Sequence, residues 1–501
     1  WMDRLLLWIM LVMLTTGGCV MSFTHELDME DVLDYENNVG PKVAIETDLD
    51  DEWSTNSGDQ AQWFTQTVDH FSFHSDTFQQ QYYVNDTFWD REMAGPIFLI
   101  IGGENPITSK YVTGQFVIND YAREHGALLL AIEHRFYGKS IPTPDLSTPN
   151  LDLLSSDQAL ADIANFRNYI SFKYRAFTNK WIAFGGSYGG VLAAWTRLKY
   201  PYLVDASISS SAPVKVQANF AEYYESAATS LGAECASAIA QATTTIAAIL
   251  QTSDRRVIES MFKTCSSIRT DDDITTFFEA LASSVTEIVQ YNNANNRYRR
   301  FNIDKMCSMI RNGEDRVRSF ANYMQEYLRF SSKPCTTSNY LGLIDLLRNT
   351  SVNAKFIKAR AWTWQTCNEF GFFGSTQQSN QLFSSMVTLP WYLKRCEDIF
   401  GPREDGEPYQ PKVEWLNKKT FWTHSFFSNG LIDPWHSLGL LNSSSPLVMT
   451  YVMENSAHCA DFFPPTTYDL EELSTSRRMQ NDFIASTIAR QRFPSLPTSK
   501  R

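Results

Sequence analysis

The chain has 501 residues, of which 43% are hydrophobic and 20% charged, and its formal net charge is −13 at pH 7. This is the composition of a globular protein, and the length allows more than one domain. The negative charge argues against a nucleic-acid partner, because such a surface cannot neutralise a row of phosphates. The sequence contains no CxxC pair of the kind that holds zinc, and we expect neither a metal nor another cofactor.

The first 22 residues are predicted to be a secretory signal peptide. Arg4 precedes a short apolar run at 5–14, and small residues follow at 15–18, which is the order of regions in such a signal. An uncleaved anchor is the alternative, although the run is short for a membrane span. Residues 23–60 are acidic and poor in core-forming side chains, so we expect a disordered or propeptide-like segment. The mature protein is then extracellular or lysosomal/endosomal, without a membrane span.

The cysteines agree with an oxidising, secretory compartment. Of the 8 cysteines, Cys19 falls at the edge of the signal and Cys459 is left over. The others lie in one central region and are Cys235, Cys265, Cys307, Cys335, Cys367 and Cys396. An even number in this setting predicts that they form disulfides. N-x-S/T triplets at Asn85, Asn349 and Asn442 are candidate glycosylation sites in the same route.

From residue 61 onward the pattern is that of an α/β domain. Two segments alternate like antiparallel strands, at 63–68 and 78–84. Continuous apolar runs then predict buried parallel strands, at 96–102, 127–133, 181–184 and 204–209. Helical spacing of apolar residues predicts helices at 157–174 and 191–200. Strands separated by helices in this way indicate a doubly wound sheet.

A helical region interrupts this domain. It contains the six central cysteines and has predicted helices at 227–250, 277–289, 317–330 and 340–347. Strands are predicted again at 420–427 and 446–453, and a closing helix at 469–491. We therefore expect an α/β domain in two segments, 61–215 and 401–490, a disulfide-stapled helical cap at 216–400, and a polar tail at 491–501.

Gly185, Ser187 and Gly189 form a G-x-S-x-G pattern at the junction of a predicted strand and a predicted helix. In α/β hydrolases this pattern is a strained turn that pushes the serine hydroxyl out of the sheet as a nucleophile. The oxyanion hole would then use the backbone N–H of Tyr188 and that of Gly103, in the loop after the first parallel strand. A glycine-rich loop without chemistry is the alternative interpretation.

The order Ser, Asp, His along an α/β-hydrolase chain selects the other two catalytic candidates. Only His424, His436 and His458 follow Ser187. His424 falls within a predicted strand, and His436 is only three residues from the candidate acid Asp433. We therefore predict His458 as the general base and Asp433 as the acid that orients it. A turn carboxylate and a surface histidine are the alternative roles of these two residues.

Other residues near these positions are candidates for supporting roles. Glu104, after the oxyanion glycines, and Trp435, beside the acid, are candidate substrate-binding residues, and Glu104 would meet a charged substrate end. Asp461 is a weaker candidate acid, because it lies too close to His458 in sequence to come from the preceding strand. Cys459 is an alternative nucleophile, although a buried thiol is the commoner role of such a cysteine.

Seven segments of the chain resemble the S28 serine peptidases, a family that includes prolyl carboxypeptidase, dipeptidyl peptidase II and thymus-specific serine protease. They follow the family's order and are TVDHF at 67–71, EHRFYG at 133–138, SSDQALAD at 155–162, GGSYGG at 185–190, QTCNEFGFF at 365–373, NGLIDPW at 429–435 and SAHCAD at 456–461. The resemblance is closest to the thymus-specific branch. It implies an α/β-hydrolase fold with an inserted helical cap (SKS-type), and hydrolysis of peptide bonds, typically after proline near a chain end.

The resemblance also implies residue roles. It carries over Ser187 as nucleophile, Asp433 as acid and His458 as base, and it implies the disulfides Cys235–Cys307, Cys265–Cys335 and Cys367–Cys396. Two features depart from the carboxypeptidase members. No further cysteine lies between Ser187 and Cys235, and none of residues 459–463 is basic, so nothing there would receive a substrate carboxylate.

The predicted function is therefore that of a serine exopeptidase acting on peptides. The sequence does not decide between a monomer and a homodimer. An apolar slot for a proline ring would come from Trp362, Trp364, Phe370 or Trp435, for which core packing is the alternative role. An α/β hydrolase acting on esters or lipids is a second hypothesis, and it would need a continuous apolar channel in the cap. A non-catalytic binding protein is a third, and such proteins usually lack a triad residue.

Overall fold

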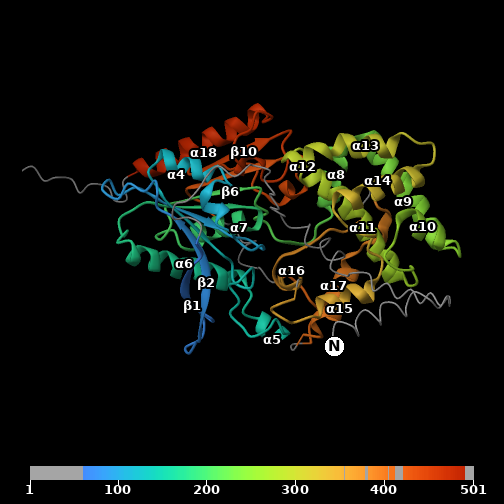
Figure 1. The fold of residues 1–501 in the computed structure, drawn as a ribbon, viewed down its shortest axis with the longest axis horizontal. Helices are drawn as coiled ribbons and strands as arrows, with labels where there is room; N and C mark the ends of the chain where they lie inside the picture. The colour runs from blue at the N-terminus through green and yellow to red at the C-terminus, as the bar shows by residue number, and fades with distance from the viewer. Residues whose placement is uncertain (1–59, 355, 378–381, 404–405, 412–420, 491–501) are drawn as a thin grey trace, which may run out of the picture.

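The computed structural model describes residues 60–490 apart from four short gaps, at 355, 378–381, 404–405 and 412–420. The predicted signal peptide, nearly all of the acidic segment and the polar tail lie outside the described residues. Figure 1 shows a twisted sheet flanked by helices and, beside it, a region built almost entirely of helices.

The sheet has eight strands in the order β1-β2-β4-β3-β5-β6-β9-β10. Strand β2 runs antiparallel to β1 and β4, and all other neighbours are parallel. The strands are β1 Gln62–Thr67, β2 Thr77–Asn85, β3 Ile97–Ile101, β4 Leu128–Ile132, β5 Trp181–Gly186, β6 Ala206–Ser210, β9 Ser425–Gly430 and β10 Val448–Met453. This topology, with its mainly parallel sheet and the helical insertion between β6 and β9, is the α/β-hydrolase fold, as predicted.

Helices cover both faces of this sheet (Figure 1). On one face α6 and α7 pack their apolar side chains against the strands, and on the other face α4 and α18 do so. The helices of this part are α3 Lys110–Thr113, α4 Ile118–Glu124, α5 Thr148–Leu151, α6 Ser156–Lys173, α7 Ser187–Lys199, α18 Glu471–Ala489 and the 3₁₀ turns η4 Pro434–Leu438 and η5 Ala460–Phe462. Strands β3 and β4 are buried along their whole length, which explains their continuous apolar sequences.

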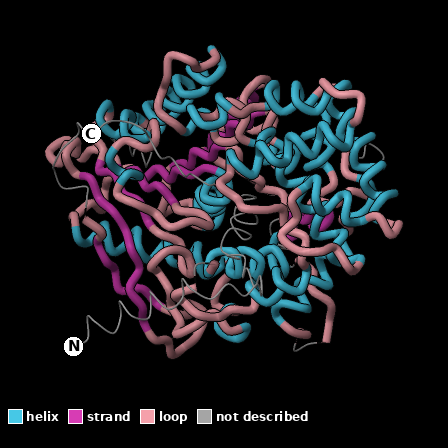
Figure 2. The backbone as a smooth tube through the Cα atoms, turned by 45° about the vertical axis from the view of Figure 1, so that its right-hand side comes forward, coloured by secondary structure: helices cyan, strands magenta, loops and turns pink. Residues whose placement is uncertain are grey.

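The insertion between β6 and β9, which we call the cap, is mostly helical, and Figure 2 shows helices gathered on the side away from the long strands of the sheet. Its elements are β7 Gln217–Asn219, α8 Glu222–Leu231, α9 Ala233–Leu250, α10 Arg255–Phe262, α11 Asp271–Gln290, α12 Asn296–Arg300, α13 Ile303–Arg311, α14 Arg316–Phe330, α15 Tyr340–Leu347, α16 Ile357–Gln365, the π-helical turn η2 Thr366–Phe370, β8 Gly371–Phe373, the 3₁₀ turn η3 Ser384–Met386 and α17 Leu389–Phe400. The predicted helical character of this region is confirmed.

Three disulfides staple the cap, and they have the pairing that the family resemblance implies. They join Cys235 to Cys307, Cys265 to Cys335 and Cys367 to Cys396. Cys459 is a free, buried thiol. Helix α9 is long and apolar enough to cross a membrane by length and composition alone, but it packs against α13 and α14 and carries the first of these disulfides, so it is a core helix of the cap.

Several predicted boundaries were wrong for local reasons. The helical run at 227–250 is divided at Gly232, whose φ of +74° ends α8 before α9 begins. The cap also contains a short parallel pair, β7 and β8, that the helical prediction missed. The strand predicted from 420 begins at Ser425, so His424 lies before the strand and not within it.

The glycosylation candidates do not share one environment. The Asn85 side chain is buried, and its amide donates a hydrogen bond of 2.8 Å to the carbonyl oxygen of Val112. Asn349 and Asn442 are exposed. A glycan on Asn85 is therefore incompatible with this fold, which corrects that part of the prediction and leaves the two other sites available.

Candidate active site

Ser187 occupies the sharp turn that the G-x-S-x-G pattern predicts. Strand β5 ends at Gly186, and α7 begins at Ser187, whose φ is +53°. A methyl group on Gly185 would lie 2.1 Å from the carbonyl oxygen of Gly189, and one on Gly189 would lie 2.5 Å from that of Ile101. Only glycine fits at both positions, and the left-handed conformation of a serine between them is a strained geometry that is typical of functional sites.

Asp433 and His458 follow the ends of β9 and β10, at the same edge of the sheet. Their side chains are completely buried, and Oδ2 of Asp433 lies 2.6 Å from Nδ1 of His458. Oδ1 of Asp433 accepts a hydrogen bond of 3.0 Å from the backbone nitrogen of Trp435. Since the carboxylate can only accept, Nδ1 carries the proton and Nε2 is the basic nitrogen.

The protonation of His458 reflects two opposing effects. Burial acts to lower the pKa of His458, but the charge of Asp433 and its hydrogen bond to Nδ1 raise that pKa well above its ordinary value. The Nε2 atom is buried and forms no hydrogen bond within the described part of the chain. An imidazole that is oriented on one side and unpaired on the other can exchange a proton with a group placed at Nε2.

The loop of His458 meets the turn of Ser187. A methyl group on Gly186, the residue before Ser187, would lie 3.1 Å from Sγ of Cys459, the residue after His458. Gly186, His458 and Cys459 also line one pocket. The structure therefore places the loop of the predicted base against the turn of the predicted nucleophile, without a hydrogen bond between their two side chains among those it shows.

The predicted oxyanion loop lies against the start of α7. A methyl group on Gly103 would lie 3.0 Å from the backbone nitrogen of Gly189. The buried carboxyl of Glu133 accepts hydrogen bonds from the backbone nitrogens of Ile107, at the end of this loop, and of Ser140. Burial raises the pKa of Glu133 to about 7. The sequence by itself assigns no role to Glu133, although this residue begins the EHRFYG segment that resembles the S28 peptidases.

The side chain of Tyr188 is tied to the cap. Gln365 Nε2 donates to the Tyr188 hydroxyl at 3.0 Å, and Gln365 Oε1 accepts from the hydroxyl of Tyr137 at 2.6 Å. Nδ1 of His134 donates to the carbonyl oxygen of Arg135, so its Nε2 accepts from the Tyr188 hydroxyl at 3.1 Å. Burial lowers the pKa of His134 to about 4, which keeps it neutral in this role. The candidate oxyanion residue is thus held by both parts of the protein.

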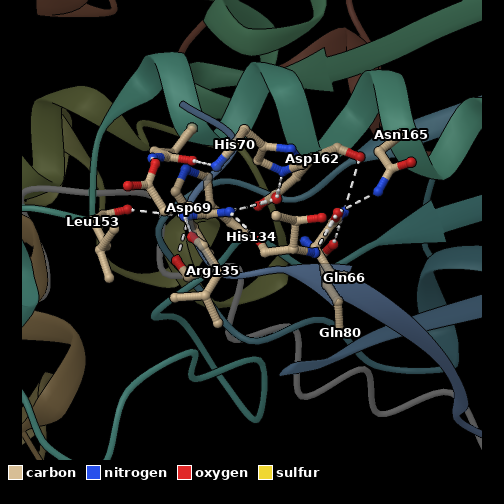
Figure 3. A network of polar contacts seen from close by, with 12 residues as sticks. Gln66, Asp69, His70, Gln80, His134, Arg135, Leu153, Asp162 and Asn165 are labelled. Atoms are coloured by element: carbon tan, nitrogen blue, oxygen red, sulfur yellow. Dashed lines mark hydrogen bonds and ion pairs between the residues drawn. The ribbon is translucent and has the colours of Figure 1, made fainter. Parts of the chain in front are cut away.

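A second polar network explains three of the resembling segments without catalysis (Figure 3). The buried guanidinium of Arg135 forms two hydrogen bonds with Asp162, of 2.7 Å and 2.6 Å, and His70 Nε2 lies 2.8 Å from the same carboxylate. Arg135 also donates to the backbone carbonyls of Thr67, Val68 and Leu153. These contacts join TVDHF, EHRFYG and SSDQALAD, and a buried charge that is paired in this way has a structural role.

Gln290, the last residue of α11, connects the cap to the loops of both triad candidates. Its backbone oxygen accepts a hydrogen bond of 2.9 Å from the backbone nitrogen of His458. Its side-chain Oε1 accepts from Trp435 Nε1 at 3.0 Å and from the Tyr223 hydroxyl at 2.8 Å. The sequence gave no signal for this role, because Gln290 ends an ordinary amphipathic helix.

Two pockets adjoin these residues. The cap pocket is rich in aromatic side chains and holds one buried ion pair. Its lining includes Tyr223, Trp362, Phe372, Trp435, Glu279 and Arg395. Of the predicted slot residues, Trp362 and Trp435 line it. Trp364 packs on Phe400 and Phe370 packs between Tyr188 and Trp195; neither lines it.

The second pocket, which we call the histidine pocket, lies beside the base. It is lined by Gly103, Glu104, Tyr111, Phe116, Tyr291, His458, Phe462 and Phe463 among others. The ring of Tyr291 meets that of His458 edge-on, with centroids 6.0 Å apart. Glu104, one of the two predicted substrate-binding residues, therefore lies next to the base, and Trp435, the other, lines the cap pocket.

The alternative candidates have other partners. The carboxylate of Asp461 accepts hydrogen bonds from Ser210, Ser476 and Gln480 and does not reach His458. His424 Nδ1 accepts from Arg197, and His436 Nδ1 donates to a backbone carbonyl. Among the described residues, no group of three or more His, Cys, Asp or Glu is arranged to hold a metal ion.

Comparison with known proteins identifies the family of this chain. Residues 66–480 match the family described as serine carboxypeptidase S28. A relative from Caenorhabditis elegans is 35% identical over 450 residues, which cover 84% of this chain and 86% of that protein. Human thymus-specific serine protease is 30% identical over 443 residues, covering 83% and 84%. Human lysosomal Pro-X carboxypeptidase is 26% identical over 445 residues, covering 83% and 86%. With this match over most of its length, the chain belongs to the serine carboxypeptidase S28 family and is a serine peptidase.

Proposed function

We propose that Ser187, His458 and Asp433 are the catalytic triad of this peptidase. The observation that carries the proposal is the buried hydrogen bond of 2.6 Å between Asp433 and His458, in a loop that meets the turn of Ser187. Each residue follows a different strand at one edge of the sheet, in the order that α/β hydrolases use. The strained φ of Ser187 supports its role as nucleophile.

The reaction proceeds through an acyl-enzyme. Nε2 of His458 takes the proton of the Ser187 hydroxyl as its oxygen attacks the peptide carbonyl carbon, and Asp433 stabilises the resulting imidazolium. Collapse of the tetrahedral intermediate breaks the C–N bond, and His458 returns the proton to the leaving amine. A water molecule, deprotonated by the same nitrogen, then hydrolyses the ester to release the second product.

The oxyanion of the tetrahedral intermediate would bind to the backbone N–H groups of Tyr188 and Gly103. Tyr188 lies in the first turn of α7, where the helix field favours negative charge. The network around its hydroxyl and the clamp of Glu133 on the oxyanion loop support a fixed geometry, which is what such donors need in order to be effective.

For the substrate, we favour peptides cleaved after proline near one end. The cap pocket adjoins the triad through Trp435, which follows Asp433, and its aromatic walls suit a proline ring. The name of the Pro-X carboxypeptidase relative points to the same residue. The alternative substrates are esters or lipids. The disulfides and the lysosomal relative support a secretory or lysosomal protein.

A fluorophosphonate probe tests the triad, because it reacts only with an activated serine. We expect labelling of the wild type and of Ser237→Ala, an exposed control, and no labelling of Ser187→Ala. Equal labelling of Ser187→Ala would refute the assignment. Peptidase activity that is kept in Ser187→Ala but lost in Cys459→Ala would support the thiol as nucleophile. A peptide library read by mass spectrometry, beside a panel of esters, tests the substrate class and the position of proline.

A further inference from the structure

Glu104 is a buried carboxyl with an unused acceptor. It directly follows Gly103 in the oxyanion loop, and only 6% of it is exposed. Its Oε1 atom is buried and accepts no hydrogen bond from any residue that the structure describes. A buried oxygen without a hydrogen bond is costly, so such an atom at the wall of a pocket points to a ligand that completes it.

The pocket that Glu104 lines is on the leaving-group side of the proposed site. His458 must hand its proton from Nε2 to the leaving amine, so the residue that follows the cleaved bond lies next to this nitrogen. Nε2 of His458 and Oε1 of Glu104 are both buried and unpaired, and both residues line the histidine pocket. The cap pocket, in contrast, is not lined by His458.

The walls of the histidine pocket define the chemistry of its occupant. The aromatic residues Tyr111, Phe116, Tyr291 and Phe462 line the same pocket as Glu104. A side chain with an aliphatic stem and a cationic head suits both the aromatic walls and the carboxylate. The stem packs on the rings, and the head pairs with the carboxylate of Glu104. Lys358 acts electrostatically on Glu104 and donates to Asn105 at 3.4 Å, but it does not line the pocket.

We propose that the histidine pocket binds the side chain of the residue that follows the cleaved bond, and that Glu104 makes it prefer lysine or arginine. A charge-assisted hydrogen bond from the cationic head would satisfy the unpaired oxygen. An acidic side chain, or the free carboxylate of a single terminal residue, would meet the like charge of Glu104 and be disfavoured. This inference rests on the proposed triad, and it extends that proposal from the reaction to the sequence that is cleaved.

The peptide library identifies the bond that is cleaved. The test then compares peptides that are identical up to that bond and carry lysine, acetyl-lysine or glutamate directly after it. Acetyl-lysine keeps the stem and removes the charge. At pH 8 we expect the wild type to show a kcat/KM for lysine about tenfold above that for acetyl-lysine, with glutamate lowest. In Glu104→Gln this ratio should approach one. Glu92→Gln, at an exposed glutamate, is the matched control and should keep the wild-type ratio.

Because each ratio is taken within one enzyme, a general loss of activity or stability does not change it. A lysine preference that is absent in the wild type, or that persists in Glu104→Gln, would overturn the inference while leaving the triad intact. If Glu104→Gln does not fold, the wild-type library still decides, since an even distribution of residues after the cleaved bond contradicts the proposal. Failure of the triad proposal would look different, because Ser187→Ala would then keep its labelling by the fluorophosphonate and its peptidase activity.

Discussion

The backbone nitrogen of His458, the proposed base, donates a hydrogen bond of 2.9 Å to the backbone oxygen of Gln290, the last residue of cap helix α11. This helix begins with a capping box, in which Thr270 and Asp273 satisfy each other's backbone nitrogens. The loop that carries the base is therefore fixed by a helix of the cap as well as by the sheet, so the cap helps to build the site that it covers.

Replacing Gln290 with methionine tests the side-chain part of this connection, because the backbone hydrogen bond to His458 remains. The substitution keeps the length of the side chain but removes the acceptor for the buried donors of Tyr223 and Trp435. We expect a loss of about 1–3 kcal/mol in the free energy of unfolding, and a fall in kcat larger than the change in KM. Thermal unfolding and steady-state kinetics measure both, with the exposed Gln241→Met as control. Wild-type values for Gln290→Met would show that these bonds do not position the triad.

Substituting asparagine for Asp433 should impair catalysis without disturbing the fold. The amide can donate to Nδ1 of His458, which would move the proton to Nε2 and leave the wrong tautomer. A fall of about 10⁴ in kcat is the expected scale for such a change, and the melting temperature should drop far less than activity does. The control is Asp482→Asn, at an exposed position. Activity within tenfold of wild type would exclude Asp433 as the orienting acid.

Stability should fall as the pH rises from about 4.5 to 7. Burial raises the pKa of Glu104, Glu133 and Glu369 to about 7 each, above their ordinary value of 4.5. In this range the folded state binds more protons than the unfolded state, so the free energy of unfolding decreases with pH. His134, with its pKa lowered to about 4, acts in the opposite direction between 4 and 6.5 but is a single group.

Thermal unfolding between pH 4.5 and 7.5 measures this dependence. A Glu369→Gln variant should show a flatter slope than the wild type, because one of the three titrations is removed. Stability that rises over this range in the wild type would contradict the assignment of buried, protonated carboxyls.

The lysine preference that we infer should itself depend on pH. Below about 7, burial keeps Glu104 protonated, and a neutral carboxyl attracts a cation weakly. As the pH rises through this value, the ratio of kcat/KM for lysine over acetyl-lysine should increase, because lysine stays charged over the whole range. Ratios measured at pH 5, 6, 7 and 8 in one buffer system test this. A ratio that is constant, or that decreases with pH, speaks against Glu104 as the partner.

Glycosylation should follow exposure and not the sequence triplet alone. We expect Asn349→Gln and Asn442→Gln each to lose one glycan when the protein is made in a secretory host, as seen by a mobility shift that a glycosidase abolishes. Asn85→Gln should show no such loss, because the Asn85 amide is bonded inside the fold. A glycan found on Asn85 by mass spectrometry would contradict the structure around Val112.

Much of the candidate site could be proposed from the sequence because its signals are local. The glycines around Ser187 are required by a turn of only a few residues. A continuous apolar run likewise indicates the position of a buried parallel strand. The order of the triad candidates along the chain narrowed the histidines to three, and their positions relative to the predicted strands and to Asp433 then left His458. The disulfide pairing, in contrast, came from the family resemblance alone, because the cysteine count allows several pairings.

Only the tertiary structure decided which segments far apart in the chain contact one another. Trp364 and Phe370 look as suitable for a substrate slot as Trp362 does, but the packing of the cap turns them into its core. The role of Gln290 and the unpaired oxygen of Glu104 have no sequence signature either. The role of each side chain depends on which group from a distant segment lies within hydrogen-bonding distance, about 3 Å. The periodicity and spacing of residues along a sequence give no information about that distance.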